Sequence, residues 1–316
     1  MESSSGDWRV KTLRFSLGQH AAAANGSPRA KRPRVDDNSA SAENGSPRAK
    51  RPRVDDSSAS GAAATGDASD EAVVRLVQLI DELATPEASA DLHFGLFLWP
   101  SALVLARYIA FHHTSRFAGR TVLELGCGIA LPGILTAVCG NARKVLLSDR
   151  ADSRSIQQNV DANIRLNDIA DVASFLPLNW GSLDLLDLTE TLRGVDVILA
   201  ADCFYQSEDF EKVLATVALV FRLSPQCTFL TVYQLRRYEP NVPDFEKVLA
   251  TVALVFRLRP QCTFLMAYQL RSINRSIAPL LSRYAMTATI LHKRAFMDVD
   301  DVPGADSVYL YEIKPV

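Results

Sequence analysis

The sequence has few cysteines, and none of them form a C-x-x-C pair. Its five cysteines are spread singly over 316 residues, and two of them, Cys227 and Cys262, are counterparts in an internal repeat. Structural zinc sites and disulfide-rich folds need closely spaced or numerous cysteines. We therefore expect no metal site and no disulfides, and interpret the cysteines as buried thiols in a reducing compartment.

Long apolar runs and an excess of charge of one sign are also missing. No apolar stretch approaches the roughly 20 residues that cross a bilayer, and the first residues lack the apolar core of a signal peptide. The formal net charge is −2, so the chain has no overall attraction to nucleic acid or to membranes. We expect a soluble protein inside the cell, without a membrane partner and with nucleic acid disfavoured as a partner.

A third absence concerns the spacing of glycines. The stretch Thr121–Ile134, TVLELGCGIALPGI, has Gly126 and Gly128 between two apolar runs, which predicts a strand, a turn and the start of a helix. A dinucleotide-binding loop has a further glycine three residues later. This chain has Leu131 there, and a pyrophosphate-binding loop is disfavoured for that reason.

The same stretch places its glycine turn between two acids. Glycine has no Cβ, so a ligand can approach the bare backbone closely. Glu124 precedes the first glycine by two residues, and Asp149 ends the next apolar run, KVLLSD. An acid at the end of a second strand is well placed to accept hydrogen bonds from ribose hydroxyls. The pattern predicts a site for a nucleoside that carries no pyrophosphate.

Residues 1–69 are interpreted as a mostly disordered tail, with a short strand at residues 8–17 as an option, because residues 18–69 have almost no large apolar side chain. The segment NGSPRAKRPRVDD occurs twice there and includes the basic clusters Lys31–Arg34 and Lys50–Arg53. Such clusters in an extended chain predict binding to a nuclear import receptor, and hence a protein of the nucleus and cytoplasm. The alternatives are a solvated charge run and, more weakly, non-specific nucleic-acid binding, since aspartates follow each cluster.

After the tail, the apolar pattern alternates between helix and strand. Residues 70–83 have apolar positions at helical spacing and predict a first helix, and Pro100 suits the first turn of a second. From Thr121 onward strands and helices follow in turn, which predicts a parallel sheet with helices on both faces. Residues 285–291 and 307–313 predict two antiparallel strands at one edge. Residues 70–316 should therefore form a Rossmann-like, doubly wound α/β domain.

Residues 209–236 and 244–271 are nearly the same sequence, DFEKVLATVALVFRL-x-PQCTFL-x-x-YQLR, thirty-five residues apart. Each copy predicts one helix and one strand. Two copies are too few for a solenoid, and a doubly wound sheet has one position for such a unit. One copy must add a strand, displace an element or dock loosely, and we expect the first copy to take the regular position. A tandem duplication and a gene-model error are both open explanations.

Several segments occur in the order and spacing of a known enzyme family. They are FGLFLWPSALVLARYI, LELGCGIALPGI, LSD, LNWG and AADCFY, and the match runs from about residue 94 to the C-terminus. In these segments the chain resembles methyltransferase-like family 16, a group of seven-strand S-adenosylmethionine-dependent methyltransferases. The resemblance implies a class I methyltransferase sheet that carries the duplicated helix–strand unit as an addition.

The resemblance also implies a cofactor and a site. The cofactor is S-adenosyl-L-methionine, and the implied catalytic residues are Asp202 and Tyr205, in the D-x-x-Y motif beside the methyl acceptor. One departure is Ala130, where many relatives have glycine; alanine costs little there if its φ is negative. Glu124 is included among the cofactor residues as a brace of the loop. The full cofactor set is Trp99, Glu124, Gly126, Cys127, Gly128, Asp149, Trp180 and Ala201.

The implied reaction is methyl transfer to a protein, with arginine as the first acceptor, a histone as one candidate substrate, and lysine second. Arginine stays charged in solution, so carboxylates must orient it, and Asp202 with Glu208 as a weaker second are the candidates. Two alternatives remain open: a non-catalytic interaction protein that retains a nucleoside pocket, and a small-molecule methyltransferase. Taken singly, the site residues also have structural readings, with Trp99 and Trp180 as core aromatics and Asp202 as a helix cap.

Overall fold

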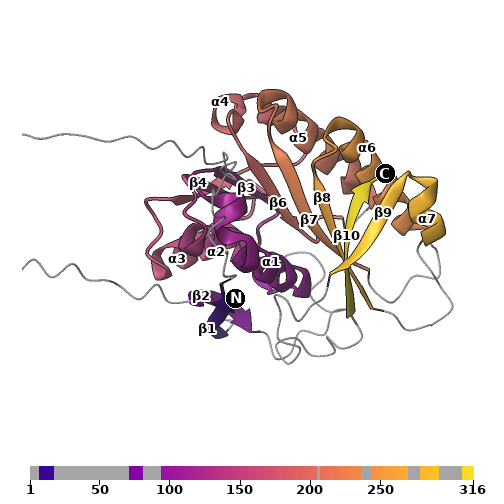
Figure 1. Cartoon of the computed structure of the whole chain (residues 1–316). Coiled ribbons are helices and arrows are strands. Elements are labelled where there is room, and N and C mark those ends of the chain that lie inside the picture. Colours follow the sequence, from indigo (N-terminus) through magenta and orange to yellow (C-terminus); the bar gives the residue numbers. More distant parts are fainter. Residues whose placement is uncertain are drawn as a thin grey trace, which may run out of the picture. The chain divides into compact units, whose positions relative to one another are not determined.

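The computed structural model describes residues 7–17, 71–80, 94–204, 207–235, 243–269, 278–291 and 308–316. Its central sheet consists of β3 (Thr121–Leu125), β4 (Lys144–Asp149), β5 (Ala173–Pro177), β6 (Val197–Ala201), β7 (Thr228–Leu235), β8 (Thr263–Gln269), β9 (Met286–Leu291) and β10 (Val308–Pro315). The spatial order is β5-β4-β3-β6-β7-β8-β10-β9, and neighbours are parallel except that β10 is antiparallel to β8 and β9 (Figure 1). This is the predicted doubly wound α/β sheet with its antiparallel pair.

Helices cover both faces of this sheet (Figure 1). One face carries α1 (Pro100–Phe117), α2 (Leu131–Cys139) and α3 (Arg154–Leu166); the other carries α4 (Thr189–Leu192), α5 (Phe210–Leu223), α6 (Pro243–Leu258) and α7 (Ala278–Arg283). In β3, Val122 belongs to the core on the α1–α2 side and Leu123 to the core on the α5 side, because alternate residues of a strand point to opposite faces. Strands that are buried on both faces are continuous apolar runs, and so the sequence identifies them.

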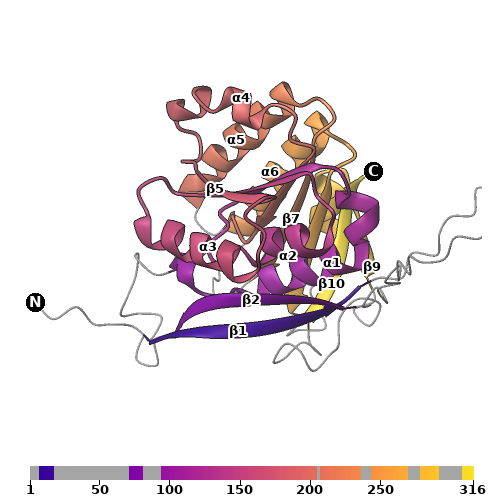
Figure 2. The same cartoon turned by 90° about the vertical axis from the view of Figure 1, so that its left-hand side faces the viewer.

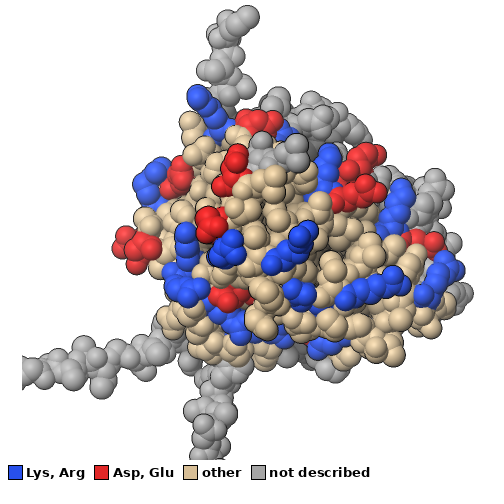
Figure 3. Space-filling model, turned by 90° about the horizontal axis from the view of Figure 1, so that it is seen from above, with Lys and Arg blue, Asp and Glu red and all other residues tan. Residues whose placement is uncertain are grey.

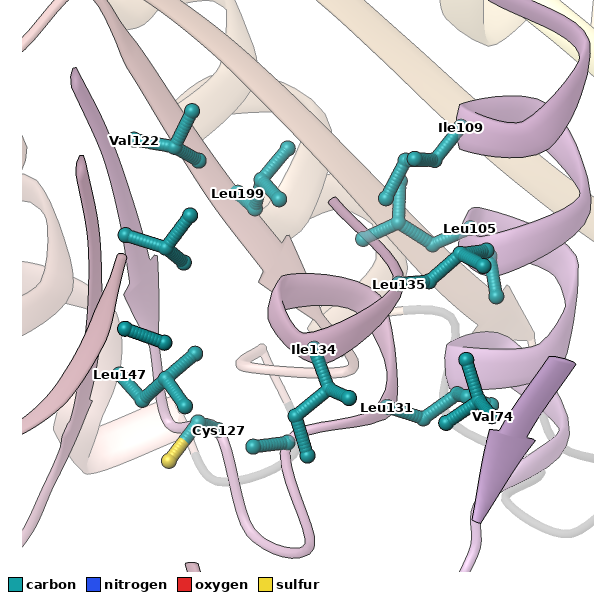
Figure 4. Packing of buried hydrophobic residues seen from close by; sticks show 14 of the residues in the cluster. Val74, Leu105, Ile109, Val122, Cys127, Leu131, Ile134, Leu135, Leu147 and Leu199 are labelled. Atoms are coloured by element: carbon teal, nitrogen blue, oxygen red, sulfur yellow. The ribbon is translucent and has the colours of Figure 1, made fainter. Parts of the chain in front are cut away.

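The helix that follows the glycine turn, α2, is buried from Leu131 to Thr136. Figure 4 shows Leu135 beside Leu105 of α1, and Leu131 beside Val74 from the N-terminal part of the chain. All four side chains are fully buried. A helix of nine residues is too short to be stable alone, so this packing fixes it, and with it the turn that leads into it.

The prediction of a helix over residues 70–83 is wrong. The structure has a strand, β2 (Glu71–Ile80), which pairs antiparallel with β1 (Asp7–Ser16) in a separate two-stranded sheet, called the ribbon below. Figure 2 shows the ribbon along α1, α2 and α3, on their side away from the central sheet. The segment EAVVRLVQLI fits both periods, since alternate residues from Ala72 to Leu76 are buried and valine favours strands. The segment forms a strand because it pairs with β1, and no local sequence pattern shows that pairing.

The short strand considered for residues 8–17 is present as β1. Residues 18–70 lie outside the described residues, and so do the two basic clusters that suggest nuclear import.

The described surface carries charged side chains of both signs (Figure 3). On the face seen in Figure 3, basic and acidic side chains are interspersed, and neither sign covers a continuous area. Within the described ranges, no group of three or more His, Cys, Asp or Glu side chains is arranged to hold a metal ion. None of the described helices combines the length and apolar content that a membrane span requires. All five cysteines are free thiols.

The two copies of the repeat lie side by side in the central sheet. The first copy supplies α5 and β7, and β7 pairs with β6 in the position predicted for it. The second copy supplies α6 and β8, which are inserted between β7 and β10. Each unit returns through a helix on the same face, so a second unit can be added next to the first without changing the winding. The duplicated unit thus adds one strand to the seven of the implied family sheet.

Identical residues in the two copies have different surroundings. In α5, Leu219 and Leu223 are half-buried and pack against a core that also contains α6. Their counterparts in α6, Leu254 and Leu258, are 47% and 49% exposed. The second copy therefore covers the first, while its own outer leucines remain at the surface.

This difference predicts unequal effects of one substitution made in each copy. Leu219→Ala should lower the free energy of unfolding by about 1–2 kcal/mol because it removes packed methyl groups. Leu254→Ala should lower it by less than about 0.5 kcal/mol. The effect of the substitution on helix propensity is the same in both variants, because the flanking sequences are the same. Urea denaturation of the two variants measures the difference, and equal losses would contradict the packing described.

Candidate functional site

A cavity of about 850 Å³ opens at the carboxyl ends of β3, β4 and β6, where doubly wound sheets bind their ligands. The predicted catalytic residue Asp202 lines it. The second, Tyr205, lies outside the described residues. The structure also brings together the whole predicted cofactor set in its wall, namely Trp99, Glu124, Gly126, Cys127, Gly128, Asp149, Trp180 and Ala201.

The loop between β3 and α2 needs glycine at two positions. Gly126 and Gly128 have φ values of 59° and 54°, a region that other residues avoid. A Cβ on Gly126 would lie 2.8 Å from a ring carbon of Trp180. A Cβ on Gly128 would lie 2.9 Å from the carbonyl oxygen of Gly95. The two glycines therefore let the loop turn sharply and approach both the Trp180 ring and the backbone of the Gly95 segment.

Strand β4 holds this loop in place. The backbone N–H of Cys127 donates to the carbonyl oxygen of Ser148 at 2.9 Å, and the N–H of Gly128 donates to Asp149 Oδ2 at 2.9 Å. The Ser148 hydroxyl donates to the carbonyl oxygen of Glu124 at 2.6 Å. Asp149 thus has one carboxylate oxygen on the loop and lines the cavity, which is where a ribose acceptor is expected.

The sequence predicts that Ala130 costs little if its φ is negative, and the structure shows a positive φ there. Its φ is +63°, not negative, so it adopts the left-handed conformation that costs a non-glycine residue roughly 1–2 kcal/mol. Its methyl group is fully buried, which returns about 0.8 kcal/mol. Ala130 also stands at the N-cap of α2 and has no side chain that can cap the helix. The cap comes from Glu124, whose Oε2 accepts the N–H of Gly133 at 2.8 Å.

Two buried carboxylates, Glu124 and Asp149, lie at the base of the cavity. Burial raises the pKa of Glu124 to about 8, against a lowering by the Gly133 hydrogen bond and with a further increase from Asp149. Burial also raises the pKa of Asp149, although hydrogen bonds from Gly128 and Arg150 lower it. Burial thus raises the pKa of both carboxyl groups, and a cationic ligand that lies against them would stabilise their ionised forms.

This burial predicts a pH dependence of stability. The pKa of Glu124 rises from 4.5 to about 8 on folding, so the folded state retains a proton that the unfolded state releases between these values. The stability that Glu124 contributes is fully present below about pH 4.5 and is lost as the pH rises through about 8. Glu124→Gln retains an acceptor for Gly133 but does not titrate. Relative to this variant, the wild type should lose on the order of 5 kcal/mol of unfolding free energy over that window. Urea unfolding of the ligand-free proteins measures this loss, and parallel pH curves would contradict it.

The wall of the cavity is acidic on balance, with five carboxylates and three basic side chains. Two of the basic groups are held in ion pairs, Arg150 with Asp152 at 3.0 Å and Lys212 with Asp209 at 2.7 Å. Apart from these two pairs, the wall has the carboxyl groups of Glu124, Asp149 and Asp202 and the guanidinium of Arg154, and a positively charged ligand would stabilise the ionised form of the three carboxyl groups.

Asp202 lies at the end of β6 in a strained conformation. Its φ is +59°, and the residue is 7% exposed. Its N–H donates to the carbonyl oxygen of Val232 at 2.8 Å, which ties it to the first repeat copy. Non-glycine residues with positive φ are concentrated at functional sites. Glu208, the weaker second candidate, is exposed and does not line the cavity, whereas its neighbour Asp209 does.

The two thiols in the wall, Cys127 and Cys203, are not nucleophiles. Burial raises the pKa of each well above its usual value, with smaller increases from nearby carboxylates. Cys203 donates its S–H to the carbonyl oxygen of Leu125 at 3.1 Å. Protonated thiols are inert, so the site has no covalent thiol chemistry to offer.

Sequence reasoning missed several wall residues. Gly95 and Phe97 come from the segment before α1, and Gly95, in the 3-10 helix Phe94–Leu96, lies against the glycine loop at Gly128. The FGLF pattern offered a weak signal, since a glycine inside an apolar run can mark the close approach of another backbone. Lys212 lies in the first turn of α5 and has an identical counterpart in α6, so no local signal identified it.

The comparisons with known proteins agree with this site. A sequence model of a family described as lysine methyltransferase matches residues 80–250, more than half of the chain. The histone-arginine methyltransferase METTL23 of Xenopus laevis is 41% identical over 145 residues, which are 45% of this chain and 58% of that protein. The human protein of the same name is 37% identical over 143 residues, 45% of this chain and 71% of that protein. The chain thus spans less than two thirds of its Xenopus relative.

Among solved structures, the chain is similar to SMU.776 complexed with SAH, at 14% identity and a TM-score of 0.38, over 77% of this chain and 53% of that one. The fold assignment does not depend on so distant a likeness, because the strand order itself establishes it. The family match spans the glycine loop, Asp149, Trp180 and Asp202 together, and these are the residues that meet in the cavity. The resemblance predicted from the sequence motifs is confirmed, and the chain belongs to the lysine methyltransferase family.

Proposed function

We propose that the protein is an S-adenosyl-L-methionine-dependent methyltransferase that acts on a protein. The observation that carries the proposal is the glycine loop held between two buried carboxylates, Glu124 and Asp149, in one cavity at the carboxyl ends of parallel strands. This arrangement suits a nucleoside with a cationic side chain better than a pyrophosphate. Family membership and the names of the relatives support the same activity.

The residues present fit this cofactor. The cavity volume is within the range of about 300–1,000 Å³ usual for small-ligand sites. Bare backbone at Gly126 and Gly128 leaves room that a Cβ would fill. Asp149 would accept hydrogen bonds from the ribose, and Glu124 would lie near the cationic part. When bound, S-adenosylmethionine supplies an activated methyl group; the chain's own residues bind it, orient it and exclude water.

Asp202 is the residue proposed to orient the methyl acceptor. Its carboxylate lies in the cavity wall and would accept hydrogen bonds from a cationic acceptor side chain, which is the stronger class of hydrogen bond. We favour arginine, with a histone as the candidate substrate, because the Xenopus and human relatives are named histone-arginine methyltransferases. Lysine comes second, supported by the description of the family.

The test is transfer of labelled methyl groups from S-adenosylmethionine to a nuclear extract. The proposal expects label in protein, and hydrolysis of that protein should release methylarginine; methyllysine would favour the second acceptor. Label that persists in extract depleted of protein would indicate a small-molecule methyltransferase instead. Cofactor binding without any transfer would favour a non-catalytic interaction protein and contradict the proposed activity.

We also propose that the protein enters the nucleus through its two basic clusters. The support is the paired repeat with Lys31–Arg34 and Lys50–Arg53, which suits the acidic grooves of an import receptor. A reporter fused to residues 18–69 should accumulate in the nucleus. Replacement of the lysines and arginines of both clusters by alanine should abolish that accumulation. A purely cytoplasmic signal from the unaltered fusion would contradict the proposal.

A further inference from the structure

Asparagines on one face of α3 bind the ribbon through its backbone. Asn159, Asn163 and Asn167 follow one another at intervals of four residues, so their side chains stack along the helix. Asn163 Oδ1 accepts the N–H of Val77 at 2.6 Å, and Asn159 Nδ2 donates to the carbonyl oxygen of Val77 at 3.0 Å. Asn167 pairs with both backbone groups of Arg75, at 2.8 and 2.6 Å.

These amides take the place of a third strand beside β2. Alternate residues of a strand turn their N–H and C=O groups to the same side. Arg75 and Val77 are two positions apart and turn theirs toward α3, while β1 pairs along the other edge of β2. Val74 and Leu76, between and beside them, are buried in the core under α2 and α3. The ribbon is therefore joined to the domain by directed hydrogen bonds as well as by apolar contacts.

The middle amide also reaches the glycine loop. Asn163 Nδ2 donates to the carbonyl oxygen of Ile129 at 3.1 Å and to Asn159 Oδ1 at 3.0 Å. Ile129 follows Gly128 directly and lines the cavity. Asn163 is 0% exposed, so each of these bonds is made away from water. By contrast, Asn167 directs its amide hydrogens to Arg75 and to the carbonyl oxygen of Asn163.

The glycine loop has a backbone conformation that requires support from neighbouring residues. It passes through three positive φ values within five residues, at Gly126, Gly128 and Ala130. Conformations of this kind persist only where the surroundings hold them. A buried, fully hydrogen-bonded amide rigidifies the groups it joins, and a buried carbonyl left without its donor costs about 1–3 kcal/mol.

We propose that Asn163 is a positioning residue for the glycine loop and that, through it, the ribbon forms part of the cofactor site. The ribbon occupies residues 7–16 and 71–80, outside the family match except for its last residue. The expected effect on cofactor binding rests on the proposed function. The hydrogen bonds that join the ribbon to the loop through Asn163 do not depend on it.

The test compares Asn163→Ala with Asn167→Ala in the full chain. Both variants lose hydrogen bonds to the ribbon, but only the first loses the bond to Ile129. By calorimetry, Asn163→Ala should weaken S-adenosylmethionine binding about tenfold, the effect of one buried hydrogen bond. Asn167→Ala should change it less than about twofold. Without ligand, hydrogen exchange of the Gly128 and Ala130 amides should be faster in Asn163→Ala and unchanged in Asn167→Ala.

The possible results distinguish the positioning role of Asn163 from the proposed binding of S-adenosylmethionine. Equal effects of both variants, or no effect of either, on binding and on exchange would overturn the role of Asn163. Failure of the wild type to bind S-adenosylmethionine would refute the proposed function, while the exchange measurement would still test the tie.

A second variant keeps the test valid if Asn163→Ala does not fold. Asn163→Asp retains the acceptor for Val77, and when ionised it loses the donor to Ile129. Relative to wild type at the same pH, its loss of affinity should be largest near about pH 8 and smaller near about pH 5, where a protonated carboxyl can donate. A loss that does not change with pH would overturn the positioning role.

Discussion

Asp149→Ala is expected to abolish measurable binding of S-adenosylmethionine. In the structure, Asp149 lines the cavity with one oxygen 2.9 Å from the N–H of Gly128 and the other 2.8 Å from the N–H of Arg150. The substitution removes the acceptor for the ribose hydroxyls and also releases the loop. Hydrogen bonds to a charged group contribute about 1.5–3 kcal/mol each, so loss of a pair weakens binding about a hundredfold or more. Calorimetric titration measures the change.

Asp152→Ala is the matched control for this prediction. Its carboxylate also lines the cavity, but it is exposed at the rim and paired with Arg150. Affinity should change by less than about threefold, as is usual for an exposed ion pair. Micromolar affinity retained by Asp149→Ala would refute the assignment of Asp149 to the cofactor.

Asp202→Ala is expected to have the opposite profile: cofactor binding is spared and turnover is lost. The residue lies in the wall at the end of β6, and its backbone is held by Val232 of β7. Removal of the carboxylate should lower the rate of methyl transfer by about 10²–10⁴-fold, the range for a positioned acid–base or orienting group. The dissociation constant for S-adenosylmethionine should remain within about threefold of wild type.

The positive φ of Asp202 requires a control for backbone strain. Asn adopts this conformation readily, so Asp202→Asn retains the backbone and the shape of the side chain and removes only the charge. Turnover should fall in Asp202→Asn nearly as far as in Asp202→Ala. If Asp202→Asn keeps full activity, or if both variants lose cofactor binding, Asp202 does not act on the methyl acceptor.

The strands, and the meeting of acidic side chains at the ends of the strands, could be predicted from the sequence for one physical reason. Strands buried on both faces are continuous apolar runs, and the carboxyl ends of parallel strands share one edge of the sheet. Glu124, Asp149 and Asp202 each stand at such an end, so their meeting in one cavity followed from the order of the strands.

The failures have a different cause, because each depends on contacts between distant segments. Residues 71–80 form a strand because β1 pairs with them, and no periodicity within the segment shows that partner. Ala130 has positive φ because the loop is fixed at both ends by Ser148 and by the packing of α2. The sequence gives no sign of either constraint.

The repeat shows this limit most clearly. Helices α5 and α6 have the same sequence from the aspartate at 209 or 244 through fifteen residues, yet Leu219 is half-buried and Leu254 is exposed. Lys212 lines the cavity because the first copy lies beside β6, the strand that ends at the site. Local sequence is equal in the two copies, so only position in the sheet determines which of them belongs to the site.

The cavity should bind a nucleoside that has a cationic side chain and no pyrophosphate. Calorimetric titration of the full chain with S-adenosylmethionine, and separately with NAD, tests it most directly. We predict micromolar binding of S-adenosylmethionine with one site per chain, and no measurable binding of NAD. Tighter binding of NAD, or no binding of S-adenosylmethionine by the folded wild type, would contradict it.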